Sequence, residues 1–428
     1  MALRKIKSYL DRQTENFRVL LVTSVLNNSI RNLTRGNQQG SAAGGAAYLP
    51  LYLRSLGANS QQLGILNSLT QAANVVFALP IGWLSDRISL RKVVIAGFVL
   101  SVIAPTAFYF STSWIHAVPV MFFDGVGTTL VSIFATIFYI NSVSQASDRA
   151  TAMSLRMSLI YILGFVLPLV AAIVVTGSGG LNDQGIRPLF LIALTANLFV
   201  TIYSVLRLKE VHFLQKNNAE GTHTKDSQVK GSILADYKEI ISNKVCMKWI
   251  TTKAIRSFFL YGLSPFYSIY YVTVKGADPF IFGAMASVST IGSLIFLIPF
   301  GRLADKSGRR KIIYLTRPFN YLSIILTILA PSPIFLLVPA FVGSLQTVSN
   351  LMEITMEPEL VPPNQRGRQG GLLFFVMGLT GMIGSLVLGY LWQIVDPSIL
   401  LLLPIVADIP WLITLRTIPD TLHIVYKQ

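Results

Sequence analysis

The chain has 428 residues, of which 52% are apolar and only 13% are charged, and its mean hydropathy is +0.58. Soluble domains carry about 25% charged residues, so this composition excludes an ordinary soluble globule as well as a disordered or collagen-like chain. The net charge of +16 would otherwise suggest a nucleic-acid partner. A basic chain this apolar typically places its cations on one face of a bilayer. The composition therefore predicts an integral membrane protein with lipid around it and no nucleic-acid partner.

Residues that carry chemistry are scarce. The single cysteine, Cys246, excludes a disulfide framework and a thiolate metal site. The four histidines lie far apart in sequence and show no ligand spacing. The sequence shows no Ser/His/Asp constellation and no phosphate-binding GxxxxGK[ST] motif. We therefore expect no metal, no cofactor and no enzymatic activity.

Apolar stretches follow one another along the chain in two sets of six. A bilayer core about 30 Å thick needs roughly 20 helical residues per crossing. The stretches lie at 28–55, 60–84, 93–112, 115–143, 151–176 and 187–206, and again at 249–274, 279–301, 311–330, 333–358, 369–393 and 397–416. Short connections favour antiparallel neighbours. The predicted fold is an all-α membrane protein with twelve transmembrane helices in two pseudo-symmetric six-helix bundles.

These stretches also divide the chain into five parts. We expect a cytoplasmic amphipathic segment, an amino-terminal bundle, a cytoplasmic central loop, a carboxyl-terminal bundle and a cytoplasmic tail. Their predicted bounds are 1–18, 19–207, 208–247, 248–417 and 418–428.

The first stretch allows two interpretations. In one, a long amphipathic helix lies on the cytoplasmic face and is followed by a span that ends at Arg54. In the other, the middle of the span is polar and loosened by four glycines between 27 and 45, because it faces a wet cavity. The polar residues concerned are Arg31 and Arg35, expected at the inner mouth, and Gln38 and Gln39, expected in the cavity.

The distribution of cations predicts the orientation. If the amino terminus lies inside, the inner segments carry 26 Lys and Arg residues, whereas the outer connections carry three, Arg54, Arg187 and Lys275. This asymmetry places both termini in the cytoplasm. We expect a monomer in the plasma membrane.

The two halves repeat at a constant offset of 219 residues. The sequence PIGWLSDRISLRK at 80–92 aligns with PFGRLADKSGRRK at 299–311. Gly57 and Gly64 likewise align with Gly276 and Gly283. Parallel repeats of this kind are one architecture of alternating-access transporters. The offset therefore predicts a duplicated six-helix unit.

The segment GRLADKSGRRK at 301–311 resembles the loop signature of the major facilitator superfamily, and the copy at 82–92 has Ser89 in place of the second glycine. The resemblance implies a secondary transporter in which this motif closes the inner ends of the halves. Asp86 would meet the eleventh helix, and Asp305 would meet the start of the fifth near Ala150. The residues assigned to this gate are Gly82, Asp86, Arg87, Arg91, Gly301, Asp305, Lys306, Gly308 and Arg310.

Charged residues inside spans are costly and mark candidate functional sites. A rise of about 1.5 Å per residue places Arg256 level with Glu353, and Lys253 level with Glu357. We predict that this ladder forms an inner gate or the lower wall of the substrate path. The alternative is that the side chains extend to the inner headgroups. Arg156 is also expected at the inner mouth.

Two further charged residues are expected to have structural roles. Arg317, near the inner end of the ninth span, is expected to anchor headgroups. Asp408 precedes Pro410 and is expected to satisfy freed backbone donors.

Asp124 and Glu353 are the candidates for proton coupling. Asp124 lies in the outer half of the fourth span among aromatic and small neighbours, which favour a protonated carboxyl. By height its best match is Tyr161, because Arg156 lies about two turns too low. A hydrogen-bonded structural acid is the alternative. Tyr261, Tyr267, Gln346 and Asn350 are candidates for the cavity lining, although polar residues in spans also join helices.

The function that these patterns favour is secondary active transport of a small polar or anionic organic solute, coupled to protons. A proton-antiport exporter of hydrophobic drugs is one alternative, favoured by the aromatic seventh span. A non-transporting membrane receptor with the same fold is another.

Overall fold

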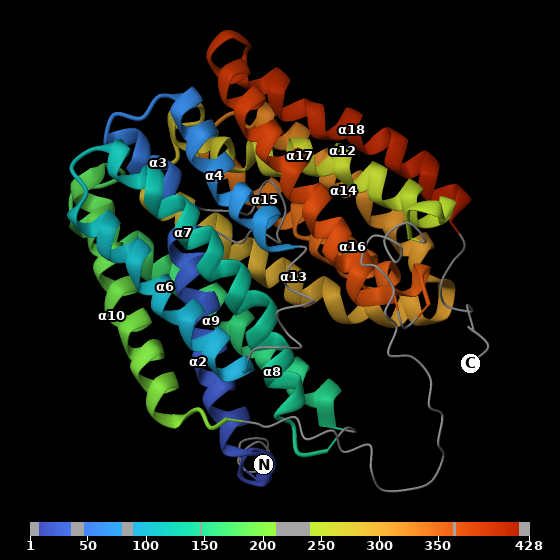
Figure 1. The fold of residues 1–428 in the computed structure, drawn as a ribbon. Helices are drawn as coiled ribbons and strands as arrows, with labels where there is room; N and C mark the ends of the chain where they lie inside the picture. Colours follow the sequence, from blue (N-terminus) through green and yellow to red (C-terminus); the bar gives the residue numbers. More distant parts are fainter. Residues whose placement is uncertain are drawn as a thin grey trace, which may run out of the picture.

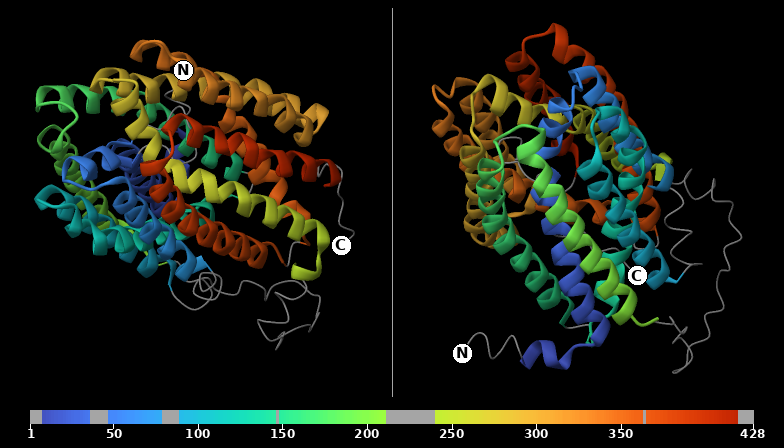
Figure 2. Two further views of the ribbon diagram at one scale, coloured as in Figure 1. Left: turned by 90° about the horizontal axis from the view of Figure 1, so that it is seen from above. Right: turned by 90° about the vertical axis from the view of Figure 1, so that its left-hand side faces the viewer.

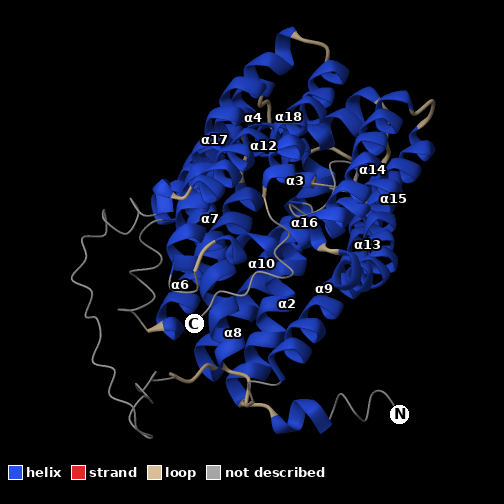
Figure 3. Cartoon of the chain, turned by 90° about the vertical axis from the view of Figure 1, so that its right-hand side faces the viewer, coloured by secondary structure: helices blue, strands red, loops and turns tan. Residues whose placement is uncertain are grey.

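The computed structural model describes most of the chain, and all the regular structure in the described part is helical (Figures 1 and 3). This confirms the predicted all-α class. The described ranges are 8–35, 47–78, 89–145, 148–210, 240–362 and 365–418. Five candidate residues lie outside them: Gln38, Gln39, Gly82, Asp86 and Arg87.

The amino-terminal half contains six helical segments, of which the first and the fourth have several parts. The π-helical turn η2 joins α7 to α8. The elements are α2 (Glu15–Arg35), α3 (Tyr48–Ser55), α4 (Ser60–Ala78), α6 (Leu90–Phe110), η1 (Trp114–His116), α7 (Ala117–Leu130), η2 (Val131–Ala135), α8 (Thr136–Asn141), α9 (Arg149–Gly177) and α10 (Asp183–Arg207).

The carboxyl-terminal half repeats this pattern. Short 3-10 or π turns extend several of its helices. The elements are α12 (Lys244–Ile269), η4 (Tyr270–Val274), α13 (Pro279–Ser307), α14 (Arg309–Leu329), η5 (Pro333–Leu336), α15 (Leu337–Gly343), α16 (Leu345–Met356), η6 (Glu357–Leu360), α17 (Arg366–Ile394) and α18 (Pro397–Thr417).

Each of the twelve predicted stretches contains helix. In the described part of the chain, eight helical segments are long and apolar enough to cross a membrane. The first stretch differs from its predicted bounds, because α2 begins at Glu15 and packs against α9 and α10 (Figure 2, right). Its 21 residues extend about 31 Å. The interpretation of a helix lying on the membrane surface is therefore wrong for α2, which belongs to the bundle.

Side-chain caps explain where several helices begin. Asn182, Asn243, Asp278 and Asp396 each accept a hydrogen bond from a backbone N–H of the first turn of α10, α12, α13 and α18, respectively. These caps satisfy donors that have no partner inside the helix.

The turn between α13 and α14 explains the second glycine of the repeated motif. Gly308 has a φ of 96°, a conformation that residues with a Cβ rarely adopt. The equivalent position before α6 is Ser89, whose φ is −53°. The turn at Ser89 therefore needs no glycine, which accounts for the departure of the first copy from the motif.

The 219-residue repeat is visible in the backbone. Gly57 and Gly276 both have positive φ, 92° and 71°, just before α4 and α13. Gly64 of α4 lies against α17, where an added Cβ would be 3.0 Å from the Cα of Gly389. Gly283 of α13 lies against α9, where an added Cβ would be 2.5 Å from the carbonyl oxygen of Pro168. The two halves therefore meet at two equivalent crossings, α4 with α17 and α13 with α9.

We call the end of the molecule that carries 142–145, 302–311 and 357–362 the basic end, and the end that carries 56–59, 178–182 and 395–396 the neutral end. Hydrogen bonds between the halves lie toward the neutral end. Asn67 Nδ2 donates to the carbonyl oxygen of Tyr261 at 2.7 Å, and Ser287 Oγ donates to that of Phe165 at 2.7 Å.

At the basic end the halves lie apart. A Cβ added at Gly301 of α13 or Gly370 of α17 would meet nothing within 4 Å. In Figure 1, the helices of the two halves meet around α3, α4 and α7 and then diverge toward the lower and right-hand edges of the picture. The described conformation is closed at the neutral end and spread at the basic end.

The Gly64→Ala change tests the α4–α17 crossing. The added methyl group has no room against Ser385 and Gly389, so α4 and α17 must separate. Overpacking of this kind costs about 1–3 kcal/mol, and we expect a lower midpoint of thermal unfolding in detergent.

Gly177→Ala is the matched control, because a Cβ there meets nothing within 4 Å. Alanine has the higher helix propensity, so this variant should unfold at the same temperature or slightly above. Equal midpoints for both variants would contradict the close crossing.

Candidate functional site

Five charged side chains from four helices form a network inside the carboxyl-terminal half. Lys253 and Arg256 come from α12, Arg317 from α14, Glu353 from α16 and Asp408 from α18. The Glu353 carboxylate contacts all three cations, with Arg256 Nη1 at 2.9 Å. Asp408 lies 2.6 Å from Arg256 Nε and 3.2 Å from Arg317 Nη1. The network therefore connects four helices of one half.

The network is buried. The side chains of Arg317 and Glu353 are 1% and 2% exposed. The guanidinium groups of Arg256 and Arg317 lie 4.7 and 4.8 Å from the ring centre of Trp411, where a cation–π interaction offsets part of their lost hydration. Three cations contact two acids, and a third acid, Glu357, interacts with Lys253 at longer range.

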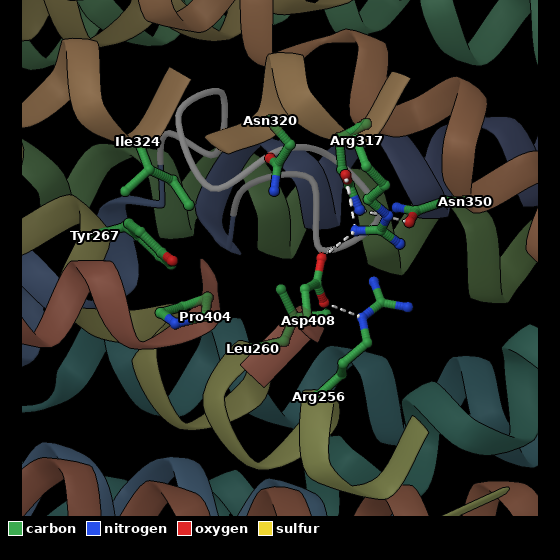
Figure 4. A pocket seen from close by; sticks show the side chains of 10 residues that line it. Arg256, Leu260, Tyr267, Arg317, Asn320, Ile324, Asn350, Pro404 and Asp408 are labelled. Carbon is green, nitrogen blue, oxygen red and sulfur yellow. Dashed lines mark hydrogen bonds and ion pairs between the residues drawn. The ribbon is translucent and has the colours of Figure 1, made fainter. Parts of the chain in front are cut away.

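A small cavity adjoins this network (Figure 4). Gln346 accepts a hydrogen bond from Arg317 at 3.1 Å and donates one to Asn350 at 2.8 Å. Tyr267 lies across the cavity in Figure 4. Asn320 Oδ1 is buried and has no hydrogen-bond partner in the part of the chain that the structure describes. The cavity therefore offers both donors and acceptors to a polar solute.

The predicted ladder is partly confirmed. Arg256 pairs with Glu353, as their heights indicate. The direct ion pair of Lys253 is with Glu353 rather than with Glu357, which interacts with Lys253 only at longer range. Height along a helix does not determine which way a long side chain turns, and the Glu353 carboxylate is where all three cations converge.

The roles expected for Arg317 and Asp408 are also wrong. Arg317 is fully buried rather than placed at the headgroups, and Asp408 binds two arginines and accepts a hydrogen bond from Tyr321 at 3.1 Å. Because an ionisable group inside a span is costly, the sequence alone marks both residues as candidates for a functional role. Their partners lie on different helices, and helix packing was not available from the sequence.

A second charged group lies inside the amino-terminal half. Arg35, at the end of α2, forms an ion pair with Asp124 of α7, and their side chains are 9% and 10% exposed. Arg31 and Asn197 line the same small cavity as this pair. Asp124 therefore has a cationic partner that the sequence did not reveal.

This geometry corrects two predictions. Tyr161 is not the counterpart of Asp124, and Arg31 and Arg35 lie beside Asp124 rather than at the inner mouth. The reason is the early start of α2: Arg35 lies twenty residues, or about 30 Å, beyond Glu15.

The remaining candidates lie outside these two groups. Arg156 is buried against the Tyr139 ring, 5.7 Å from its centre. Tyr261 packs on Gly381 of α17, at an interface between helices. No group of three or more His, Cys, Asp or Glu side chains within the described ranges is arranged to hold a metal ion.

The repeated motif forms contacts within each half. Arg91 donates to the carbonyl oxygen of Val205 at the end of α10, and the equivalent Arg310 donates to that of Ile418 after α18. Cations at helix carboxyl ends are stabilising. Asp305 and Lys306 are exposed at the basic end, so the predicted approach of Asp305 to α9 is absent from the described conformation. Gly301 likewise has no neighbour within 4 Å of an added Cβ.

Glu353→Gln tests the network. The change leaves Lys253, Arg256 and Arg317 with one acid, and breaking a buried ionic cluster costs about 3–5 kcal/mol. We expect a large fall in the midpoint of thermal unfolding. Adding Lys253→Met should recover part of the loss, because in the described residues Lys253 forms an ion pair with Glu353 alone.

Glu359→Gln is the control for this prediction. Its partner Arg309 lies in a more exposed pair at the basic end, with side chains 20% and 31% exposed. Exposed pairs contribute about 0–1 kcal/mol. If Glu359→Gln lowers the unfolding midpoint as much as Glu353→Gln does, the buried network contributes no more to stability than an exposed ion pair.

Comparison with known proteins gives a consistent result. The sequence matches the profile of the Major Facilitator Superfamily at residues 39–385 and 250–422. An uncharacterised MFS-type transporter from Methanocaldococcus jannaschii, MJ1317, is 22% identical over 355 residues, which cover 81% of this chain and 83% of the relative.

Solved structures share the fold. A variant of the nucleoside transporter NupG superposes with a TM-score of 0.71 at 13% identity, covering 94% of this chain and 99% of that one. A D-xylose-proton symporter gives a TM-score of 0.66 at 13% identity, covering 94% and 98%. FucP in its outward conformation gives 0.63 at 13% identity, covering 94% and 99%. The chain belongs to the major facilitator superfamily.

Proposed function

We propose that this multi-pass membrane transporter is a secondary active transporter that works by alternating access and couples a polar or anionic organic solute to protons. The observation that carries this proposal is a buried ionic group beside a cavity in each half, around Asp124 and around Glu353. Charges inside a membrane protein are costly and are typical of solute and proton pathways.

The distribution of ion pairs supports movement of the halves as units. Every ion pair in the described residues joins helices or adjoining segments of the same half. The halves contact each other through glycine crossings, a shared cluster of buried apolar side chains and a few uncharged hydrogen bonds. Rotating one half against the other therefore breaks no ion pair among these residues.

The cation distribution supports an orientation with the basic end in the cytoplasm, as in the positive-inside rule. In that orientation, the described conformation faces inward. The exposed Asp305 belongs to a gate that is open, and its approach to α9 would accompany closure of the basic end. Both termini then lie in the cytoplasm, and the plasma membrane is the proposed location.

Asp124 is the better candidate for carrying the proton. Its carboxylate has one cationic partner, Arg35, whereas Glu353 contacts three cations. Neutralising Glu353 would disrupt all three ion pairs. Neutralising Asp124 releases a single arginine at the edge of a cavity, a change that movement of the halves can accommodate.

The charges also bear on the solute. Among the described residues, the carboxyl-terminal cavity is lined by two arginines and Asp408, and the amino-terminal cavity by two arginines and Asp124. Each cavity therefore has one excess positive charge, which favours an anionic solute over a cationic drug. Tyr261, part of the aromatic pattern that suggested a drug exporter, packs at a helix interface. A hydrophobic dye assayed beside organic acids would distinguish the two functions.

Asp124→Asn tests proton coupling. In proteoliposomes that contain the full-length protein, we expect the variant to lose accumulation driven by a proton gradient, because it has no carboxyl to protonate. Exchange of solute across the membrane at equal pH should remain.

The control is Asp183→Asn, whose acid lies in a half-exposed pair with Arg187 at the neutral end. It should accumulate solute like the unmodified protein. Undiminished accumulation by Asp124→Asn would remove Asp124 from the coupling mechanism. An absence of gradient-driven flux for any solute in the unmodified protein would favour the receptor alternative.

A further inference from the structure

Arg35 lines two neighbouring cavities. One contains Asp124, and the other lies between the two halves. α7 contributes to both, since Asp124 lines the first and Met121, one turn earlier, lines the second. Arg35 therefore separates the two cavities, and a molecule that displaces its side chain would contact both.

The first cavity presents guanidinium donors. Arg31 Nε and Arg35 Nη2 are buried and have no hydrogen-bond partner in the described part of the chain. Asp124 is the only acid among the residues that line this cavity, so two guanidinium groups face one carboxylate. The planar fork of arginine matches a carboxylate, which can accept two parallel hydrogen bonds.

The second cavity is lined by eight apolar residues and by four polar ones, Arg35, Asn67, Thr70 and Ser264. α3 contributes Leu49 and Leu53, α4 contributes Leu63 and Leu66, and α12 of the other half contributes Pro265. Burying a methylene group in such surroundings is favourable by about 0.8 kcal/mol. Because α3 and α4 belong to one half and α12 to the other, a molecule bound in this cavity would contact both halves.

We propose that the transported solute is an amphipathic organic monocarboxylate. Its carboxylate binds Arg31 and Arg35, and its hydrocarbon part occupies the cavity between the halves. This inference rests on the proposed transport function and adds the substrate class and its binding residues. A sugar or a nucleoside lacks the anionic group that these arginines recognise.

Asp124 competes with the solute for Arg35. While Asp124 is ionised, it holds the Arg35 guanidinium; a protonated Asp124 releases it to the solute carboxylate. The other charged residue lining the cavity is Arg31, on α2, while α6 and α10 contribute Ser101 and Asn197. α4 meets α7 through Thr70 and Ala73, which carry no charge. Solute binding and proton uptake are thereby linked.

The test measures binding to the purified full-length protein by equilibrium dialysis and thermal shift, with butyrate, hexanoate and octanoate as probes. We expect affinity to rise up to about fourfold for each added methylene group, the equivalent of the methylene transfer free energy. The straight-chain alcohols of equal length should bind on the order of tenfold or more weakly, because they lack the charge. Equal binding of acids and alcohols, or no dependence on chain length, would overturn the proposal.

Two variants test the residues. Arg35→Gln should weaken octanoate binding on the order of 10- to 100-fold, as expected for loss of a charged hydrogen-bond donor. Asp124→Asn should strengthen octanoate binding at pH 7.5 on the order of tenfold, because the carboxylate that competes for Arg35 is gone. A gain of affinity cannot result from misfolding, so this variant remains decisive if Arg35→Gln folds poorly. An unchanged affinity in Asp124→Asn would contradict the competition.

The control is Arg187→Gln, an arginine of the same half that lies at the neutral end and lines neither cavity. It should bind octanoate like the unmodified protein, and an equal loss in Arg187→Gln and Arg35→Gln would show a general charge effect. If a proton gradient drives accumulation of a neutral solute and no carboxylate binds, the proposed substrate class is wrong but the proposed transport function holds. If nothing is driven by protons, the proposed function itself fails.

Discussion

The pairing of ions that are buried away from water is the constraint on which this structure depends. Glu353 and Asp408 neutralise charge on Lys253, Arg256 and Arg317, and four helices are joined as a result. Separating these helices would leave unpaired charges in a medium that solvates them poorly. The carboxyl-terminal half is therefore held together by ion pairs that favour a rigid unit, while uncharged contacts join it to the amino-terminal half.

The contacts between the halves have the opposite character. At Gly64 and Gly283 the helices approach so closely that no side chain fits, and packing at these points depends on shape rather than on charge. Small-residue crossings of this kind can form and separate without exposing an ion. The two crossings are equivalent under the sequence repeat. The neutral end is therefore closed by two close glycine contacts of the same kind, one from each half.

Much of the fold follows from sequence pattern, and less of the site does. The apolar stretches predicted where the helices lie, and the repeat predicted that Gly57 and Gly276 have equivalent positions. The Arg256–Glu353 pair followed from rise per residue. The pairs of Asp124 and Asp408 did not, because they depend on the start of α2 at Glu15 and on the faces that helices present to one another. One residue of error in a helix rotates a side chain by about 100°.

Distances between spin labels test the central claim, that two rigid halves move about the buried charged groups. In a Cys246→Ala background, one labelled pair would be at Gln61 and Gln393 at the neutral end, and the other at Gln145 and Arg302 at the basic end, all exposed positions. Imposing a proton gradient with solute should lengthen the first distance distribution and shorten the second. Two distributions that stay fixed under active transport, or that both widen together, would contradict the account.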